Sequence, residues 1–210
     1  MMTSAEPAEE RVPGLRERKK ARTRAAIQQE AMRLFRERGY DDTTVEDIAA
    51  AAEVSESTFF RYFPTKEDVV LRDDYDEILL QAFLAQPPEL TPLRAAKAAI
   101  DGMVPTFVAG LSPEERELEN LRTALTFTVP EVRARWADEL SDVFRRFARA
   151  ISERSGRPAD DFRVRVFTGA VLGVMMAVFE PIVGDPRQDW TELIPMLDQA
   201  LDLLEQGLPL

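Results

Sequence analysis

Apolar residues recur at helical spacing in nearly every segment of this chain, and no segment alternates as a half-buried strand would. A first helix is expected over about 16–38, with Gly39 at its end. Further long helices are expected over about 66–85, 92–110, 113–128, 131–154, 159–183 and 189–206, separated mainly by prolines and glycines. With two short helices described next, the pattern predicts an all-α protein of about nine helices.

Two short helices with an apolar face are expected between residues 43 and 63. Thr43, with Glu46 three residues later, has the spacing of a capping box and is expected to start the first helix. Ser55 is a good N-cap for the second, which runs over about 56–62. Only the turn Ala52-Glu53-Val54 separates them, and a turn of this length sets two helices at a steep angle. The segment therefore predicts a helix-turn-helix.

Prolines and polar caps mark the next boundaries. Pro64 ends the second short helix, and Thr65 with Asp68 three residues later starts the helix that follows. Pro105 lies inside the expected helix over 92–110, where the loss of a backbone hydrogen bond is expected to kink or split that helix.

The ordered residues of this region resemble the helix-turn-helix of the TetR family of bacterial one-component transcriptional regulators. The family pattern Thr-x-x-x-Ile-Ala-x-x-Ala is matched by Thr44, Ile48, Ala49 and Ala52. The pattern Val-Ser-x-x-Thr-Phe-aromatic-x-Tyr-Phe-x-x-Lys is matched by the run 54–66. The resemblance covers about residues 22–70 and implies a DNA-reading domain followed by a helical ligand-binding and dimerisation domain.

Two residues depart from the family pattern. Glu53 stands where the family usually has glycine, which places a side chain at a left-handed turn position at a cost of about 1 kcal/mol. Phe60 stands where tyrosine is usual, so a hydroxyl that would contact a phosphate is missing.

The resemblance also implies which residues contact DNA. These are Arg22, Arg24, Thr44, Ser55, Glu56, Ser57, Phe60, Arg61, Tyr62 and Lys66. Glu56, Ser57, Phe60 and Arg61 are expected to enter the major groove, where an arginine donates to guanine, and the others are expected to lie near phosphates. Tyr62 is ambiguous, because its helical spacing from Phe59 also fits a core position.

Length and charge fit this arrangement. The expected domains are a disordered tail over 1–14, a DNA-binding domain over 15–66 and a second helical domain over 67–210. The whole chain has a net charge of −11, but the segment from Arg11 to Arg24 holds seven basic residues against Glu17 alone. This segment is either a solvated basic tail or part of a DNA-binding surface, and its position next to the helix-turn-helix favours DNA.

The chain contains no cysteine and no histidine, which excludes Ser-His and Cys-His nucleophilic pairs and Cys/His zinc sites. No glycine-rich phosphate loop is present either. We therefore expect no enzymatic activity, no cofactor and no bound metal. The N-terminus does not resemble a signal peptide, and the most apolar run, over 166–179, is short for a membrane span, so a cytoplasmic protein is expected.

The last two helices are expected to form a two-fold homodimer through a four-helix interface. A helix that is apolar all round needs a partner on every side, and a small bundle leaves one such face uncovered. The expected interface residues are Gly169, Gly173, Leu193, Leu197, Leu201 and Leu204. The alternative is a larger monomeric core.

The second domain also offers soft apolar residues for a hydrophobic effector. They are Met103, Phe107, Leu121, Leu125, Phe127, Phe144, Phe147, Met175, Met176 and Phe179, for each of which plain core packing is the alternative. Arg122 is the polar exception: it either meets an anionic headgroup, forms an ion pair or faces solvent. The recognition segment is similar to the branch that includes the mycofactocin-system regulator, which implies an acyl-CoA or fatty acid as one class of effector. A hydrophobic drug, a terpenoid or a polyketide-like metabolite is the alternative.

The sequence thus predicts a ligand-responsive transcriptional regulator. In its expected form, a homodimeric repressor binds a palindromic operator on double-stranded DNA and is released by a hydrophobic small molecule. An activator of the same fold, and a helical dimer that binds hydrophobic ligands without specific DNA reading, are the alternatives.

Overall fold

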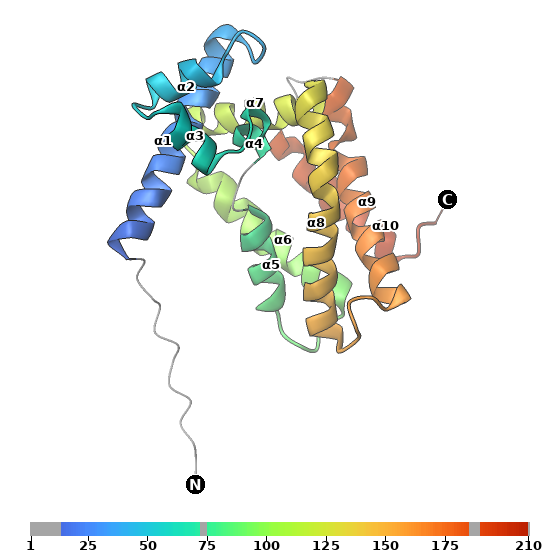
Figure 1. The fold of residues 1–210 in the computed structure, drawn as a ribbon. Coiled ribbons are helices and arrows are strands. Elements are labelled where there is room, and N and C mark those ends of the chain that lie inside the picture. Colours follow the sequence, from blue (N-terminus) through green and yellow to red (C-terminus); the bar gives the residue numbers. More distant parts are fainter. Residues whose placement is uncertain (1–13, 72–74, 185–189, 210) are drawn as a thin grey trace. The chain divides into compact units, whose positions relative to one another are not determined.

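A computed structural model describes residues 14–71, 75–184 and 190–209 of the 210-residue chain (Figure 1). Within these helices, the side chains of residues 75, 76, 104, 107, 108, 180–184, 190, 193 and 194 lie outside the description. The described residues form ten α-helices and one 3₁₀-helix, with no strand among them. The predicted all-α fold is therefore confirmed.

The chain divides into two compact units, which meet in sequence between Pro64 and Thr65. This division falls two residues before the domain boundary that was expected after residue 66. Thr65 and Lys66, grouped with the DNA-binding domain by their sequence, therefore belong to the second unit.

The first unit contains α1 (Leu15–Arg38), α2 (Val45–Ala51) and α3 (Glu56–Tyr62). Helix α1 ends where Gly39 adopts a φ of 90° and donates its N–H to the carbonyl of Phe35 at 2.9 Å. The buried apolar residues of this unit come from all three helices and from the residues that follow α1 and α3: Ile27, Ala31, Met32, Leu34, Phe35, Tyr40, Ile48, Ala49, Phe59 and Phe63. The predicted inner face of α1 therefore forms the core over which α2 and α3 are held.

The second unit holds the remaining elements, which are α4 (Lys66–Leu71), α5 (Tyr75–Leu84), α6 (Pro92–Gly110), α7 (Pro113–Thr128), α8 (Pro130–Ser155), α9 (Phe162–Gly184), η1 (Trp190–Leu193) and α10 (Ile194–Glu205). Most boundaries lie within about three residues of those predicted, because prolines and caps mark them in the sequence. Ser112, for example, accepts a hydrogen bond from the N–H of Glu115 at 3.2 Å and closes a capping box at the start of α7. Helix α6 continues through Pro105, so of the two outcomes expected at that residue the split does not occur, and the kink stays a prediction.

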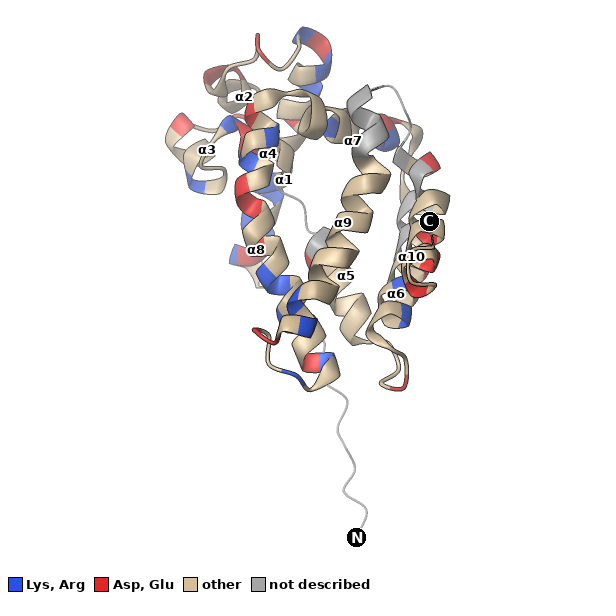
Figure 2. Cartoon of the chain, turned by 90° about the vertical axis from the view of Figure 1, so that its right-hand side faces the viewer, with Lys and Arg blue, Asp and Glu red and all other residues tan. Residues whose placement is uncertain are grey.

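Two clusters of buried side chains hold the second unit together. The first, centred on Phe83 and Ile151, joins α5, α6, α8 and α9. The second, centred on Ile100, Val178 and Leu201, joins α6, α9 and α10. Outside this second cluster, Lys97 of α6 forms ion pairs with two aspartates of α10, and Figure 2 shows the acidic residues of α10 near the basic residues of α6.

Candidate nucleic-acid interface

The start of α2 is capped by Thr44. Its side-chain oxygen accepts a hydrogen bond from the N–H of Asp47 at 3.1 Å, and the Asp47 carboxylate accepts from the backbone N–H of Thr44 at 3.0 Å. These bonds from the Thr44 side chain and backbone hold the pKa of Asp47 below its ordinary value, with a smaller contribution from Arg38 in the same direction.

The expected capping box of Thr43 and Glu46 is therefore wrong by one residue. Thr43 is fully buried, and its hydroxyl donates to the carbonyl of Gly39 at 2.8 Å, so it ties the loop after α1 rather than capping α2. Thr44 is exposed at the first turn of α2, where its position fits the expected approach to a phosphate.

The turn between α2 and α3 has the geometry of a Schellman cap. The N–H of Val54 donates to the carbonyl of Ala49 at 2.9 Å, and the N–H of Glu53 donates to the carbonyl of Ala50 at 3.2 Å. Glu53 has a φ of 53°, which confirms the predicted left-handed position. Both hydrogen bonds of the cap are therefore formed, although the Cβ of Glu53 makes this left-handed conformation less favourable than it would be for glycine.

Helix α3 begins at the N-cap Ser55, as predicted. Its side-chain oxygen accepts from the N–H of Thr58 at 3.1 Å and lies 2.9 Å from the hydroxyl oxygen of Ser57. Ser55 is therefore a structural residue of α3, and any contact that it makes with DNA is additional to this role.

One face of α3 is buried and the other is exposed. Phe59 and Phe63 have no exposed surface, with ring centroids 6.0 Å apart. Phe60 is 47% exposed and its ring packs edge-on against Phe59. The outward residues of α3 include the four that were predicted to enter the major groove: Glu56, Ser57, Phe60 and Arg61. The structure thus brings these four side chains together on one short helix, on the side opposite its buried face.

Tyr62 is half-buried, so its exposure does not decide between the two predicted roles, a phosphate contact and a core position. The guanidinium carbon of Arg61 lies 5.4 Å from the centre of the Tyr62 ring, a cation–π distance. The Tyr62 ring thereby supports an arginine on the exposed side of α3.

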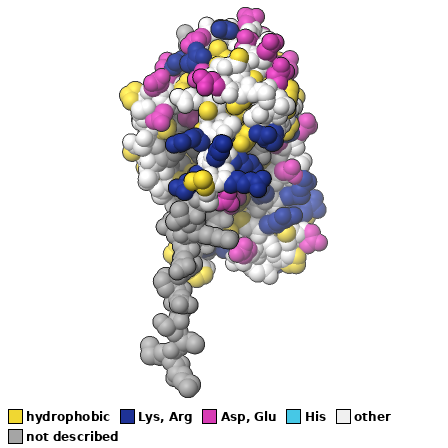
Figure 3. Space-filling model, turned by 60° about the vertical axis from the view of Figure 1, so that its left-hand side comes forward, with side chains coloured by type: hydrophobic (Ala, Val, Ile, Leu, Met, Phe, Trp, Pro, Cys, Tyr) yellow, Lys and Arg dark blue, Asp and Glu magenta, His cyan; other side chains and the backbone are white. Residues whose placement is uncertain are grey.

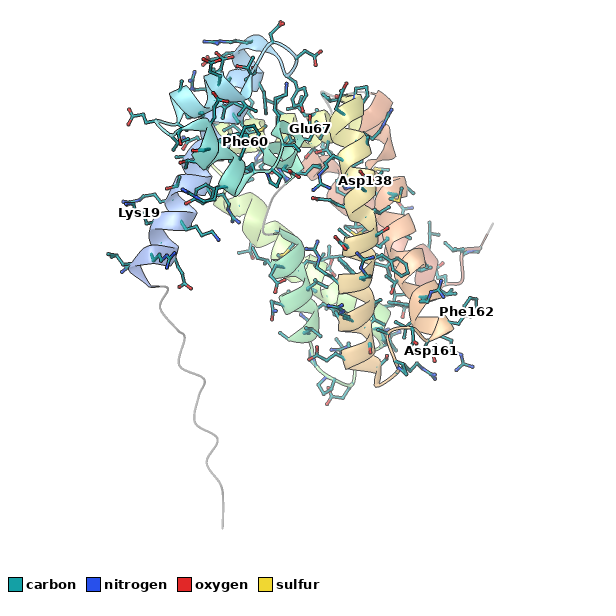
Figure 4. All side chains as sticks on the ribbon, in the orientation of Figure 1. Lys19, Phe60, Glu67, Asp138, Asp161 and Phe162 are labelled. Carbon is teal, nitrogen blue, oxygen red and sulfur yellow. The ribbon has the colours of Figure 1, made fainter. Side chains whose placement is uncertain are left out.

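Basic side chains are concentrated at the start of α1. The exposed basic residues of this part of α1 are Arg16, Arg18, Lys19, Lys20 and Arg22. Figure 3 shows dark-blue side chains gathered around the point where α1 begins, and Figure 4 shows Lys19 pointing away from the helix. Arg24 is half-buried and interacts within the protein. Arg22 and Arg24 were predicted from the sequence as DNA contacts, but their four exposed basic neighbours were not. The run of basic residues in the sequence is the feature that could have identified these four.

The predicted effector residues do not form a single group. Phe144 and Phe147 pack against the first cluster of the second unit, whereas Phe127, Met175 and Phe179 pack against the second. Met103, Leu121 and Leu125 are half-buried, and the side chain of Phe107 lies outside the described residues.

Aromatic rings beside the second cluster link α7, α8 and α9. The Phe127 ring stacks on Phe179 at 6.1 Å and meets Trp136 edge-on at 5.6 Å. Arg122 forms an ion pair with Glu119 at 2.9 Å, which fits the ion-pair alternative given above. Plain packing therefore accounts for most of these residues in the present arrangement.

An open groove of about 460 Å³ lies between α8 and α9. Its lining includes Leu140, Phe144 and Arg145 from α8, and Gly169, Gly173 and Met176 from α9. Two of the predicted effector residues, Phe144 and Met176, thus meet the two glycines that were predicted for a dimer interface.

The remaining predicted interface residues divide between core and surface. Leu197 and Leu201 are 7% and 1% exposed in the single chain, so they are core residues and the expectation that they contact a second chain is wrong in this arrangement. Leu204 is half-buried, and the side chain of Leu193 lies outside the described residues. The exposed large apolar residues of α10 are instead Met196 and Leu203.

Helix α9 is long and apolar enough to cross a membrane by length and composition alone, over Phe162–Phe179, and 22% of that window is buried in the single chain. This window is longer than the run of 166–179 that was judged too short from the sequence. Figure 2 shows few charged residues on α9.

Comparison with known proteins connects both units to one family. Residues 27–72 match the model of bacterial regulatory proteins of the tetR family, and residues 91–209 match the model of the MftR C-terminal domain. The transcriptional regulator TcmR of Streptomyces glaucescens is 34% identical over 200 residues, which cover 93% of this chain and 88% of TcmR. The MftR match agrees with the similarity to the mycofactocin regulator noted from the sequence.

Solved structures show the same fold. A TetR-family regulator from Syntrophomonas wolfei superposes with a TM-score of 0.62 at 19% identity, covering 91% of this chain and 98% of that one. FadR of Thermus thermophilus, a TetR-family transcriptional repressor solved with lauroyl-CoA, has a TM-score of 0.51 at 25% identity and covers 89% of this chain and 95% of its own.

Proposed function

This chain belongs to the TetR family of transcriptional regulators, and from that premise we propose that it is a repressor that binds a palindromic operator as a homodimer and leaves it when a hydrophobic acyl compound binds. Membership in this family makes the protein a ligand-responsive DNA-binding regulator and confirms the prediction that it is not an enzyme. The sign of regulation, the operator symmetry, the dimer and the effector are the proposed parts.

The exposed face of α3 carries this proposal. Its outward side chains combine an arginine, a carboxylate, a hydroxyl and an aromatic ring, which are groups that read base edges and thymine methyl groups in a major groove. The basic start of α1 supplies the charge that attracts phosphates, although the chain as a whole is acidic. We infer that Arg22, Thr44 and Lys66 contact phosphates and that Arg61 reads a base.

A homodimer is supported by apolar surface that the single chain leaves uncovered. On α9, Phe162 is 76% exposed, Val166 53% and Met176 44%, and their spacing places them on one face with Gly169 and Gly173. Figure 4 shows Phe162 at the start of α9, directed away from the neighbouring helices.

The exposed stripe of Met196 and Leu203 on α10 is the matching element. In a two-fold dimer, this stripe from one protomer fits the groove between α8 and α9 of its partner, and both copies gain the same contact. Such an interface covers the apolar face of α9 with protein instead of lipid, which supports a cytoplasmic location. A two-fold dimer also places two copies of α3 on one duplex, and this requires an operator with two symmetric halves.

An acyl compound is supported by the lauroyl-CoA bound to the FadR relative and by the similarity to the mycofactocin-regulator branch noted from the sequence. The second unit of this chain offers flexible methionines and aromatic rings along α7, α8 and α9, which suit a long apolar chain. Any effector must bind the DNA-incompetent state more tightly than the competent one, by about 1–3 kcal/mol for typical coupling.

The test begins with selection of duplexes from a random library by the purified protein. We expect a recovered sequence with two symmetric halves, bound more tightly than random duplex and with an affinity that falls as salt rises. Recovery of no sequence above random duplex contradicts the regulator proposal. A single asymmetric site contradicts the two-fold operator while leaving DNA reading intact.

The effector is tested on the recovered duplex with lauroyl-CoA, lauric acid and coenzyme A as matched probes. Release by lauroyl-CoA but not by coenzyme A identifies the acyl chain as necessary, and release by lauric acid alone shows that the carboxylate suffices. If none of the three changes DNA binding, the proposed effector class is wrong. A reporter placed behind the recovered duplex then separates repression from activation by its response to loss of the protein.

A further inference from the structure

The basic residues of the second unit are concentrated near the turn between α8 and α9. The segment 145–165 holds seven arginines against three acidic residues, whereas the rest of the segment 67–210 holds eight basic and 23 acidic residues. Figure 2 shows blue segments along the half of α8 that leads to this turn. A polyanion is therefore repelled by most of the unit and attracted to this part of it, because charges act over roughly 10 Å at about 0.1 M salt.

Three of these arginines lie along the groove between α8 and α9. Arg145 lines the groove, and Arg149 follows it by one helical turn on the same face of α8. Arg165 precedes Gly169, a residue of the opposite wall, by one turn of α9. A Cβ added to Gly169 would lie 3.9 Å from the ring of Phe144, so the two walls face each other at this level. We call this end of the groove, defined by Arg145, Arg149 and Arg165, the basic end.

The guanidinium groups of the basic end are available to a ligand. Among the residues that the structure describes, the side chains of Arg149 and Arg165 form no hydrogen bond or ion pair, and both residues are exposed. Arg145 is paired with Asp142, but their side chains are 62% and 65% exposed, and an ion pair in such a position contributes little. A phosphate or carboxylate can therefore gain charge-assisted hydrogen bonds here without breaking a strong internal contact.

The rest of the groove is mainly apolar. Its walls include Ala137, Leu140 and Phe144 of α8, and Leu172, Gly173 and Met176 of α9. From the basic end to Ala137, the groove follows α8 for roughly 18 Å. A ligand that has a long apolar chain and an anionic head at one end matches this arrangement.

This groove is open in the single chain, whereas the aromatic rings near it are packed. Phe127 stacks on Phe179, so a ligand must separate these two rings before it can lie between them. The groove requires no such separation. Its apolar end, at Met176, is next in the chain to Met175, which packs against the second cluster. The apolar chain of a bound ligand therefore runs from the basic end toward that cluster.

The proposed dimer uses the same groove. There, the stripe of Met196 and Leu203 from one protomer lies between α8 and α9 of its partner. A volume of about 460 Å³ is typical of a site for one small molecule. Leu140, Phe144 and Met176 therefore cannot be covered by the partner and by an acyl chain at the same time.

We propose that this groove is a binding site for an anionic amphiphile, whose phosphate or carboxylate head contacts the basic end and whose apolar chain excludes α10 of the partner. The inference rests on the proposed homodimer and effector class, and it adds the place where the effector binds and the consequence for assembly. By linkage, the ligand weakens the dimer by the same factor by which dimerisation weakens ligand binding.

The site is tested by titration calorimetry without DNA, with lauroyl-CoA, lauric acid and coenzyme A as probes at concentrations where they form no micelles. Arg149→Met and Arg165→Met, made together, remove two guanidinium groups and keep side chains that are long and flexible. The matched control is Arg163→Met. Arg163 is exposed on the same helix and carries the same charge, but its position two residues from Arg165 places it on a different face of α9.

We expect the double variant to bind lauroyl-CoA about tenfold more weakly than wild type, because it loses charge-assisted hydrogen bonds. Arg163→Met is expected to stay within about twofold of wild type, and coenzyme A is expected to bind more weakly than lauroyl-CoA because it lacks the chain. Equal affinity of wild type and the double variant for lauroyl-CoA and for lauric acid overturns the assignment of the basic end. An equal loss in Arg163→Met overturns it too, and coenzyme A that binds as tightly as lauroyl-CoA overturns the role of the apolar walls.

Sedimentation over a range of protein concentrations tests the exclusion of the partner. At about ten times its own Kd, lauroyl-CoA is expected to raise the dimer dissociation constant by about a hundredfold, because both protomers must lose a ligand before they associate. Gly173→Leu is expected to weaken dimerisation and ligand binding together. A Cβ at Gly173 meets no atom within 4 Å, so the new side chain occupies the groove without disturbing the fold. An intact dimer that carries one lauroyl-CoA per chain overturns the exclusion.

Failure of the proposed function gives different results. If the wild-type protein is a monomer at every concentration, the homodimer and the exclusion fail together, and the double variant still decides whether the groove is the ligand site. If lauroyl-CoA binds the groove and separates the protomers but leaves the selected duplex bound, the proposed effector role fails and the groove site stands.

Discussion

Replacing Glu53 with glycine tests the strain in the turn between α2 and α3. Glu53 has a φ of 53°, and a residue with a Cβ pays about 1–2 kcal/mol in that region. Glycine avoids this cost but loses about 0.5–1 kcal/mol more conformational entropy on folding. Both hydrogen bonds of the cap come from backbone N–H groups, so they survive the change. The difference predicts that Glu53→Gly stabilises the first unit by about 0.5–1 kcal/mol.

Hydrogen exchange of the peptides that span α2 and α3 is the appropriate assay. The chain has two units, so a single thermal transition need not report the first unit alone. Exchange from the first unit is expected to slow by about two- to fivefold, which corresponds to the predicted gain in stability. Peptides of α9 serve as an internal reference, because the substitution lies outside their unit.

Glu53→Ala is the control that separates the effect of backbone strain from the effect of removing a negative charge. Alanine loses the carboxylate but keeps a Cβ at the same φ, so it is expected to leave the strain in place. If alanine slows exchange as much as glycine does, the gain comes from removing a negative charge, and the argument from backbone conformation is refuted. If glycine slows nothing, the turn pays no measurable cost for its side chain.

Four other predictions concern the proposed surfaces and one cap. Arg61→Ala is expected to cost about 1–3 kcal/mol on the selected duplex and to relax one base position, and equal loss on random duplex contradicts base reading. Lys66→Ala is expected to weaken all duplexes alike and to reduce the salt slope by about one, as titration with salt will show. Combined Met196→Glu and Leu203→Glu are expected to convert a dimer into monomers in light scattering; an unchanged mass contradicts the proposed interface. Folding lowers the pKa of Asp47, so its negative charge stabilises the folded protein at pH values above the pKa of an unfolded aspartate, and this contribution is lost as the pH falls. In thermal unfolding, the stability advantage of wild type over Asp47→Asn should therefore shrink below about pH 4.

The helices were predictable because local signals marked their ends. Proline, glycine and serine caps carry this information within a few residues, as Ser112 and Gly39 illustrate. The start of α2 was misplaced by one residue because Thr43 and Thr44 both precede an acidic residue at the capping distance. The burial of Thr43 within the first unit distinguishes it from the exposed Thr44, and burial depends on tertiary packing.

The candidate DNA-binding residues were predictable for a different reason. The ordered pattern of the helix-turn-helix assigns each position of α3 to an inner or outer face, and the buried Phe59 and exposed Phe60 agree with it. The proposed interface on α10 was not predictable in the same way. Helical periodicity groups Leu197 with Leu201 on one face, but it does not say whether that face meets its own chain or another. In the structure this face packs on Ile100 and Val178.

The effector prediction leads to a physical requirement for release. Phe127 of α7 stacks on Phe179 of α9, so an acyl chain that enters this cluster must separate packed rings before it gains contacts of its own. A close-packed core does not yield continuously, and such an entry favours a discrete shift of α7 or α8. Helix α4 packs against both α7 and α8, and Asp68 is tied to α8 by Arg135. A ligand that binds tightly only after these helices have shifted therefore also moves α4. Such a ligand has a higher affinity for the shifted state than for the packed state, and this difference in affinity is what the proposed release from DNA requires.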